Sequence, residues 1–95
     1  MASLTLTSVV TRGQAHVETD FADQTLMMSL DQGKYYAVAD TAKRIWNLLA
    51  EPRSLADVCA ILQQEFDVDP SDCQRQVLDF AKALQRNGLI VEHHA

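Results

Sequence analysis

The sequence predicts an α+β fold, in which a three-stranded antiparallel sheet precedes three helices. Two observations support it: residues 1–39 favour β-strands, with β-branched and alternating apolar side chains, and the rest of the chain carries apolar side chains at helical spacing. At 95 residues, 47% of them hydrophobic, the chain is expected to form one ordered domain over residues 1–95. No internal repeat or low-complexity linker divides it.

The strands are expected as follows. Residues 4–10 form the first strand, and residues 11–23 are polar and leave their structure open, a short edge segment at residues 16–18 being one alternative. Leu26, Met28 and Leu30 alternate with Met27 and Ser29, which places the first three on one face of the next strand.

A turn at residues 31–33 is expected to lead into a partner strand, Lys34–Ala39. Gly33 can adopt a positive φ in this turn. The alternation of side chains along a strand places Tyr36 and Val38 on one face and Tyr35 and Ala37 on the other. We therefore expect both faces of this strand to carry apolar groups.

Three helices follow. The first is expected over about residues 41–50, capped by Asp40 or Thr41 and ended by Pro52. The second is capped by Ser54 with Asp57 three residues later. The apolar stripes of these two helices are Ala42, Ile45, Trp46 and Leu49, and Leu55, Val58, Cys59, Leu62 and Phe66.

The third helix is expected to begin at Asp69 or Ser71 and to stop at Asn87-Gly88, after which residues 89–91 pack back as an apolar tail. Its stripe is Cys73, Val77, Phe80, Ala81 and Leu84. The order of the helices resembles a winged helix-turn-helix.

Composition restricts the function. The formal net charge of −5 disfavours binding to nucleic acid or to anionic membranes. No apolar run approaches the ~18 residues of a membrane span, and no secretory signal is visible, so a cytoplasmic location is expected. Cys59 and Cys73 are interpreted as small buried hydrophobes, since their number and spacing suit neither a disulfide framework nor a metal site.

Winged-helix DNA binding is the main alternative function. The third helix carries Arg75, Lys82 and Arg86, but Asp72 and Asp79 lie on the same stripe. Opposite charges three and four residues apart pair with each other, which indicates a self-neutralised face and not a phosphate-binding one.

The sequence motifs give little support for metal binding or for catalysis. Residues 67–72 resemble the start of a calcium loop, but Asp72 stands where that loop needs Gly, and Leu78 where it needs Glu. No paired carboxylates, phosphate-binding loop or nucleophile elbow is present. We therefore expect a non-enzyme without cofactor or metal, whose exposed strand edge could pair with an extended peptide.

Several segments, in order, resemble the PqqD-like family. They are residues 30–38, 41–49, 54–58, 66–69, 77–84 and 87–90, and together they span about residues 22–91. Two departures stand out: Ala39 occupies a position where the family commonly has Asn, and the residues before 22 match poorly.

The resemblance implies a RiPP recognition element, a domain that binds the leader segment of a ribosomally made precursor peptide. The form of the chain is most similar to the stand-alone recognition protein of lasso peptide pathways, whose partners are the precursor, a leader peptidase and possibly a cyclase. It implies a leader with a Tyr-x-x-Pro element, added as a strand beside Lys34–Val38 and facing the third helix. The implied peptide-binding residues are Leu30, Lys34, Tyr35, Tyr36, Ala37, Val38, Cys73, Gln76, Val77, Phe80 and Leu84. A small subunit of a larger enzyme is a further alternative.

Overall fold

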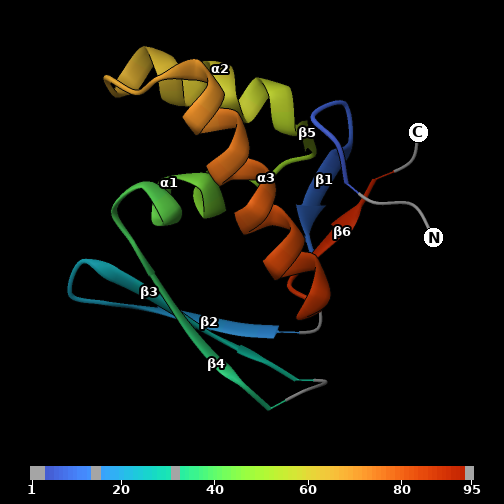
Figure 1. The fold of residues 1–95 in the computed structure, drawn as a ribbon. Helices are drawn as coiled ribbons and strands as arrows, with labels where there is room; N and C mark the ends of the chain where they lie inside the picture. Colours follow the sequence, from blue (N-terminus) through green and yellow to red (C-terminus); the bar gives the residue numbers. More distant parts are fainter. Residues whose placement is uncertain (1–3, 14–15, 31–32, 94–95) are drawn as a thin grey trace.

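A computed structural model describes residues 4–13, 16–30 and 33–93. Within these described residues there are three helices and six strands, and the strands form two three-stranded antiparallel sheets with the orders β5-β1-β6 and β2-β3-β4 (Figure 1). The α+β fold with three helices is thereby confirmed. The elements are β1 Val9–Arg12, β2 His16–Phe21, β3 Gln24–Ser29, β4 Tyr35–Ala39, α1 Asp40–Leu48, β5 Arg53–Ser54, α2 Leu55–Glu65, α3 Pro70–Arg86 and β6 Ile90–Glu92.

The sheet β2-β3-β4 is made from one continuous stretch of chain. β2 is a full strand, longer than the edge segment considered from the sequence, and it pairs with β3 from His16 opposite Ser29 to Phe21 opposite Gln24. β3 then pairs with β4, with Met28 opposite Tyr35. Gly33 has a φ of 66°, as expected of the turn, whose Asp31 and Gln32 lie outside the described residues.

The sheet β5-β1-β6 joins segments that are far apart in the sequence, and two predictions change here. The first strand, expected at residues 4–10, begins only at Val9, because Thr5 and Ser8 form a local turn. The Ser8 hydroxyl accepts a hydrogen bond from the Thr5 N–H at 3.0 Å, and such side-chain bonds compete with strand pairing. The apolar tail after Gly88 is a strand, β6, since it pairs with β1.

The start of α1 differs from the prediction. The residue at the N-cap is Ala39, and its side chain makes no capping hydrogen bond, so neither Asp40 nor Thr41 is the cap. Asp40 instead adopts a φ of 53°, a left-handed conformation that Asp tolerates better than most residues, and the chain turns there directly from β4 into the helix. α1 ends at Leu48, two residues before the expected end.

The caps of the other two helices are confirmed. The Ser54 hydroxyl accepts a hydrogen bond from the Asp57 N–H at 3.1 Å. The Asp69 carboxylate accepts from the N–H groups of Ser71 and Asp72, and Pro70 occupies the first turn of α3. At the other end of α3, Gly88 has a φ of 73°, as the Asn-Gly stop predicts.

The core lies between the helices and the two sheets, and Trp46 of α1 is the largest fully buried side chain among the described residues. Trp46 is fully buried; its ring is covered by the Arg12 guanidinium of β1 at 4.6 Å, and its Nε1 donates to Glu18 of β2 at 2.9 Å. Arg12 in turn donates to Glu18 at 3.1 Å. This small polar group holds the two sheets and α1 together. Figure 1 shows α1 between α2 and the sheet β2-β3-β4.

Candidate functional site: a free strand edge beside a small hollow

β4 is an edge strand. It pairs with β3 on one side, and within the described residues no strand pairs with its other side. The Ser29 N–H donates to the Lys34 carbonyl at 2.9 Å, which sets the alternation of the antiparallel ladder. Lys34, Tyr36 and Val38 therefore direct their backbone groups toward β3. By the same alternation, Tyr35, Ala37 and Ala39 direct theirs outward, away from β3.

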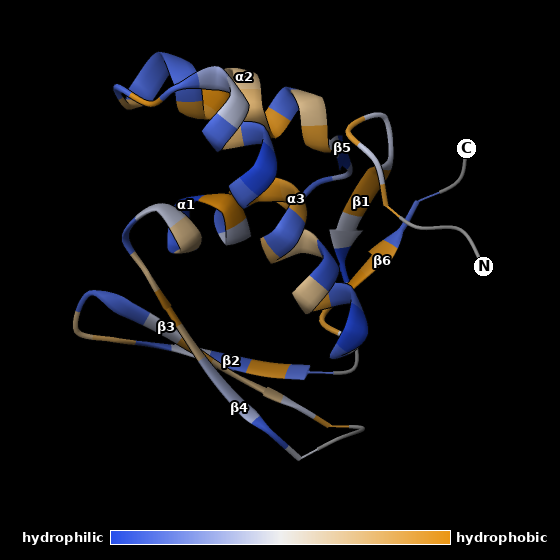
Figure 2. Cartoon of the chain, viewed as in Figure 1, coloured by the Kyte–Doolittle hydropathy of each residue, from blue (hydrophilic) through white to orange (hydrophobic). Residues whose placement is uncertain are grey.

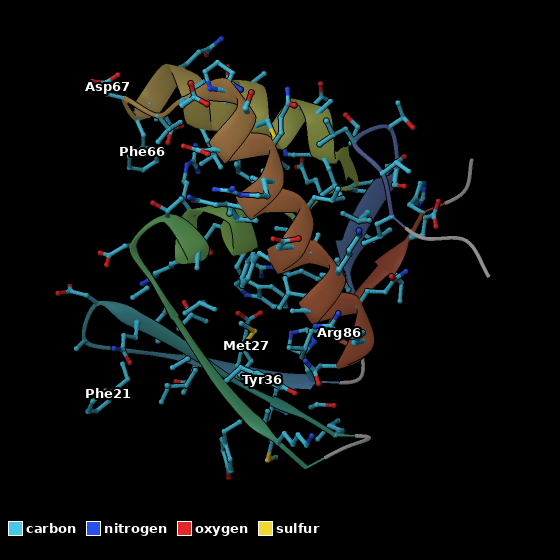
Figure 3. The ribbon with its side chains drawn as sticks, in the orientation of Figure 1. Phe21, Met27, Tyr36, Phe66, Asp67 and Arg86 are labelled. Atoms are coloured by element: carbon cyan, nitrogen blue, oxygen red, sulfur yellow. The ribbon has the colours of Figure 1, made fainter. Side chains whose placement is uncertain are left out.

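The side chains of β4 divide as the sequence predicted. Val38 is buried and Tyr36 is half-buried on the face toward the helices, whereas Tyr35 and Ala37 are exposed on the opposite face. Figure 3 shows Met27, opposite Tyr36 in the register, on the helix side of the sheet, and Phe21 pointing away from the helices.

A small hollow of about 50 Å³ lies where the three helices meet, next to the C-terminal end of β4. Residues from the beginning of α1, the end of α2 and the first half of α3 surround it. They are Thr41, Ile45, Leu62, Phe66, Val68, Cys73, Gln76 and Val77. All but Thr41 and Gln76 are apolar, so the hollow suits an apolar side chain.

Three residues expected from α3, namely Cys73, Gln76 and Val77, line this hollow. Phe80 is half-buried and Leu84 is buried in the core, and neither borders it. Leu30, Tyr35 and Ala37 lie on or next to the outer face of the sheet, away from the helices. The structure thus brings part of the predicted set together and places the rest elsewhere.

The sequence reasoning missed the wall formed by Phe66 and Val68. Phe66 was assigned to the buried stripe of the second helix, but it caps the end of α2 and is 39% exposed, as is Val68. The signal that could have found them is the pair of apolar residues within an otherwise acidic connection, residues 66–69 (Figure 3 labels Phe66 and Asp67).

The two cysteines are buried, as expected. Burial, followed by the proximity of Cys73, raises the pKa of the Cys59 thiol to about 11. The Cys73 thiol lies 3.9 Å from the Cys59 carbonyl oxygen, to which it donates. At neutral pH Cys59 is therefore protonated and a poor nucleophile.

Two oppositely charged side chains of α3, Arg75 and Asp72, form an ion pair. Arg75 donates to Asp72 at 3.0 Å, three residues away, as the charge pattern predicted. Within the described residues, no group of three or more His, Cys, Asp or Glu side chains is placed to hold a metal ion. None of the described helices has both the length and the hydropathy of a membrane span.

The chain thus combines an α+β fold with a free strand edge at β4 and a helix-lined hollow. Free strand edges are surfaces to which an extended peptide can add. Residues 24–90 match the family of the coenzyme PQQ synthesis protein D (PqqD), and the chain belongs to that family. The prediction of a PqqD-like RiPP recognition element is thus confirmed. No curated protein matches the sequence.

Two solved structures have the same fold. One is TbiB1 in complex with the TbiA(beta) leader peptide, 25% identical, with a TM-score of 0.79 over 90% of this chain and 99% of TbiB1. The other is a lasso peptide synthetase B1 complexed with the leader peptide, 23% identical, with a TM-score of 0.76 over 86% of this chain and 96% of that one. Both structures are therefore complexes with leader peptides.

Proposed function

We propose that this chain binds the leader segment of a ribosomally made precursor peptide, of the lasso type, and presents it to a leader peptidase without catalysing a reaction itself. The observation that carries the proposal is the free edge of β4, which ends beside the hollow at the helices. The family and the two leader complexes support it.

In this proposal the leader adds to the sheet as a fourth strand. The outward backbone groups of Tyr35, Ala37 and Ala39 pair with those of the leader, which accounts for affinity that does not depend on the leader's side chains. Alternate side chains of an added strand point to the same face, so every second leader residue faces the helices.

Selectivity would then come from the hollow. An apolar anchor of the leader, such as the aromatic ring or the proline of a Tyr-x-x-Pro element, would contact Phe66 and Val68 at the rim and approach Cys73, Gln76 and Val77. Phe80, which is half-buried on α3 beyond Gln76 and Val77, would extend the apolar surface of the leader site along this helix. The buried Leu84, also on α3, would support Phe80 from behind. Lys34 and Leu30 would lie at the far end of the strand.

The strand edge allows a direct test with Ala37→Pro. Proline removes the outward N–H of Ala37 and leaves the ladder to β3 intact, a position in which edge strands tolerate proline. The matched control is Ala37→Val, which retains the N–H at an exposed position. Both are titrated against a fluorescein-labelled synthetic leader by fluorescence polarisation.

We expect the wild type and Ala37→Val to bind alike and Ala37→Pro to bind about tenfold more weakly or worse, since one hydrogen bond contributes about 0.5–1.5 kcal/mol and the ring also obstructs the edge. Circular dichroism must show all three folded. Unchanged affinity of a folded Ala37→Pro would exclude strand addition at β4. A charge at Val77 is a poorer test, because Val77 is buried and the change would unfold the protein.

A further inference from the structure

The two cysteines of the chain lie next to each other on two packed helices. Cys59 is on α2 and Cys73 on α3, and both thiols are free and buried. The Cys73 thiol donates to the Cys59 carbonyl oxygen at 3.9 Å. Burial is the main cause of the raised pKa of the Cys59 thiol, and a side-chain hydrogen bond with Cys73 adds to it, so the two thiols are in contact. Because the sequence has only two cysteines, each thiol has a single possible partner within the chain.

The cysteine pair borders the hollow at which the leader is proposed to anchor. Cys73 lines this hollow. Leu62, three residues after Cys59 on α2, lines it as well, and so do Gln76 and Val77, three and four residues after Cys73 on α3. Residues three or four apart lie on the same face of a helix. The helix faces that carry the two thiols are therefore the faces that enclose the hollow. Figure 2 shows hydrophobic positions in the helices as well as in the strands.

A small oxidant can reach Cys73 through the hollow. Its volume of about 50 Å³ exceeds the ~10–15 Å³ that a single water needs, and its rim at Phe66 and Val68 is partly exposed. Hydrogen peroxide is little larger than water, so it fits where a bulkier oxidant does not.

The reaction with peroxide needs no other reagent. The Cys73 thiolate attacks one oxygen of hydrogen peroxide, the O–O bond breaks, and the hydroxide that leaves takes up the thiol proton as water, which leaves Cys73 as a sulfenic acid. The Cys59 thiolate then attacks the Cys73 sulfur, the S–O bond breaks, and a second water leaves. Two thiols and one peroxide thus give one disulfide and two waters.

Such a bond would change the shape of the hollow. A disulfide holds its sulfur atoms ~2.05 Å apart, much closer than two thiols in non-bonded contact. Bond formation therefore draws the thiol-bearing faces of α2 and α3 together. Because Leu62, Gln76 and Val77 lie on these faces, the hollow between them becomes narrower.

We propose that Cys59 and Cys73 form a reversible disulfide in the presence of peroxide, and that this bond narrows the hollow and weakens leader binding. The second part rests on the proposed leader binding, whereas the first part does not. A reduced chain would then bind the leader and an oxidised chain would release it.

Peroxide treatment followed by intact-mass spectrometry tests the bond. The matched control is Cys59→Ala, which keeps Cys73 at the hollow and removes its partner. Both proteins are oxidised at about pH 8.5, because the thiolate is the reactive form and burial raises the pKa of the Cys59 thiol to about 11. We expect the wild type to lose the mass of two hydrogen atoms and to regain it with dithiothreitol. Cys59→Ala should not show this loss.

Fluorescence polarisation with the labelled synthetic leader measures the effect on binding. We expect the oxidised wild type to bind about tenfold more weakly than the reduced wild type, since the apolar anchor loses its place, and dithiothreitol to restore the affinity. Cys59→Ala should bind like the reduced wild type before and after peroxide, because Cys59 does not line the hollow. Circular dichroism must show each protein folded, and Cys59→Val replaces Cys59→Ala if that variant is unfolded.

An unchanged mass of the treated wild type would overturn the inference, and so would a disulfide-linked dimer on a non-reducing gel. Unchanged leader affinity of the oxidised wild type would overturn the regulation. An equal loss of affinity in treated Cys59→Ala would do the same, because the effect would then come from another oxidised side chain. Failure of the reduced wild type to bind the leader would instead reject the proposed function, while the mass measurement would still decide on the bond, so the two failures are distinguishable.

Discussion

The two three-stranded sheets of this chain are assembled in different ways. The sheet β5-β1-β6 draws its strands from residues 9–12, 53–54 and 90–92, and its β1 and β6 contribute Val10 and Ile90, which are almost completely buried, to the core. The sheet β2-β3-β4 comes from residues 16–39, keeps one exposed apolar face, and has a free edge at β4.

This difference suggests that one sheet contributes chiefly to stability and the other to binding. The sheet β5-β1-β6 joins segments from the beginning, middle and end of the chain and buries Val10 and Ile90, so its side chains contribute chiefly to stability. A sheet formed from neighbouring segments can leave a face and an edge unpaired, and so can bind other molecules. The polar group around Trp46 links the two sheets.

Trp46→Ala should have the largest effect on this arrangement. It removes a fully buried ring and leaves the Glu18 carboxylate without one of its donors. Buried Trp-to-Ala changes cost about 3–5 kcal/mol, so we expect the free energy of unfolding to fall by that amount or the protein to unfold. Urea denaturation followed by far-UV circular dichroism measures it, since Trp46 is the sole tryptophan. A loss below ~1 kcal/mol would show that Trp46 does not join the sheets.

The same substitution in the two sheets should separate their roles. Val10→Ala, in β1, removes fully buried methyl groups and should lower the free energy of unfolding by about 2 kcal/mol. Val17→Ala, in β2, concerns a half-exposed side chain and should stay within about 0.5 kcal/mol of the wild type. Equal losses in urea denaturation would contradict the division between the sheets.

Tyr36→Phe should have the smallest effect, and of the opposite sign. The Tyr36 hydroxyl is buried without a hydrogen-bond partner within the described residues, and an unpaired buried polar group is destabilising. Removing it should leave stability unchanged or raise it by up to about 1 kcal/mol, as measured by thermal denaturation. Tyr35→Phe, at an exposed hydroxyl of the same strand, is the control. Clear destabilisation by Tyr36→Phe alone would indicate that the hydroxyl has a partner.

Local patterns predicted much of the fold. The hairpin around Gly33, the faces of Tyr35 and Tyr36, the caps Ser54 and Asp69 and the stop at Gly88 all depend on residues close in sequence. β1 was misplaced because Ser8 bonds to Thr5. β5 was not foreseen, and β6 was expected only as a tail, since both require β1 as a partner from a distant part of the chain.

The candidate site was predicted only in part, because some of its lining depends on contacts between distant segments of the chain. Cys73, Gln76 and Val77 were expected from the resemblance, and they do line one hollow. Phe66 and Val68 join them only because the end of α2 returns toward α1, which no local pattern encodes. Leu26 and Met28 share a face as the alternation predicts, but the sequence did not show that this face points away from the helices.

The amino-acid sequence by itself determined the identity of the helices, most of their apolar stripes, the caps of α2 and α3, the β3-β4 hairpin and the membership of a family, because these depend on short-range periodicity and turn chemistry. Only the tertiary structure decided which face of that hairpin is buried, which edge stays free and which residues surround the hollow. Those outcomes depend on contacts between distant segments, in which the helices cover one face of a sheet and leave the other exposed.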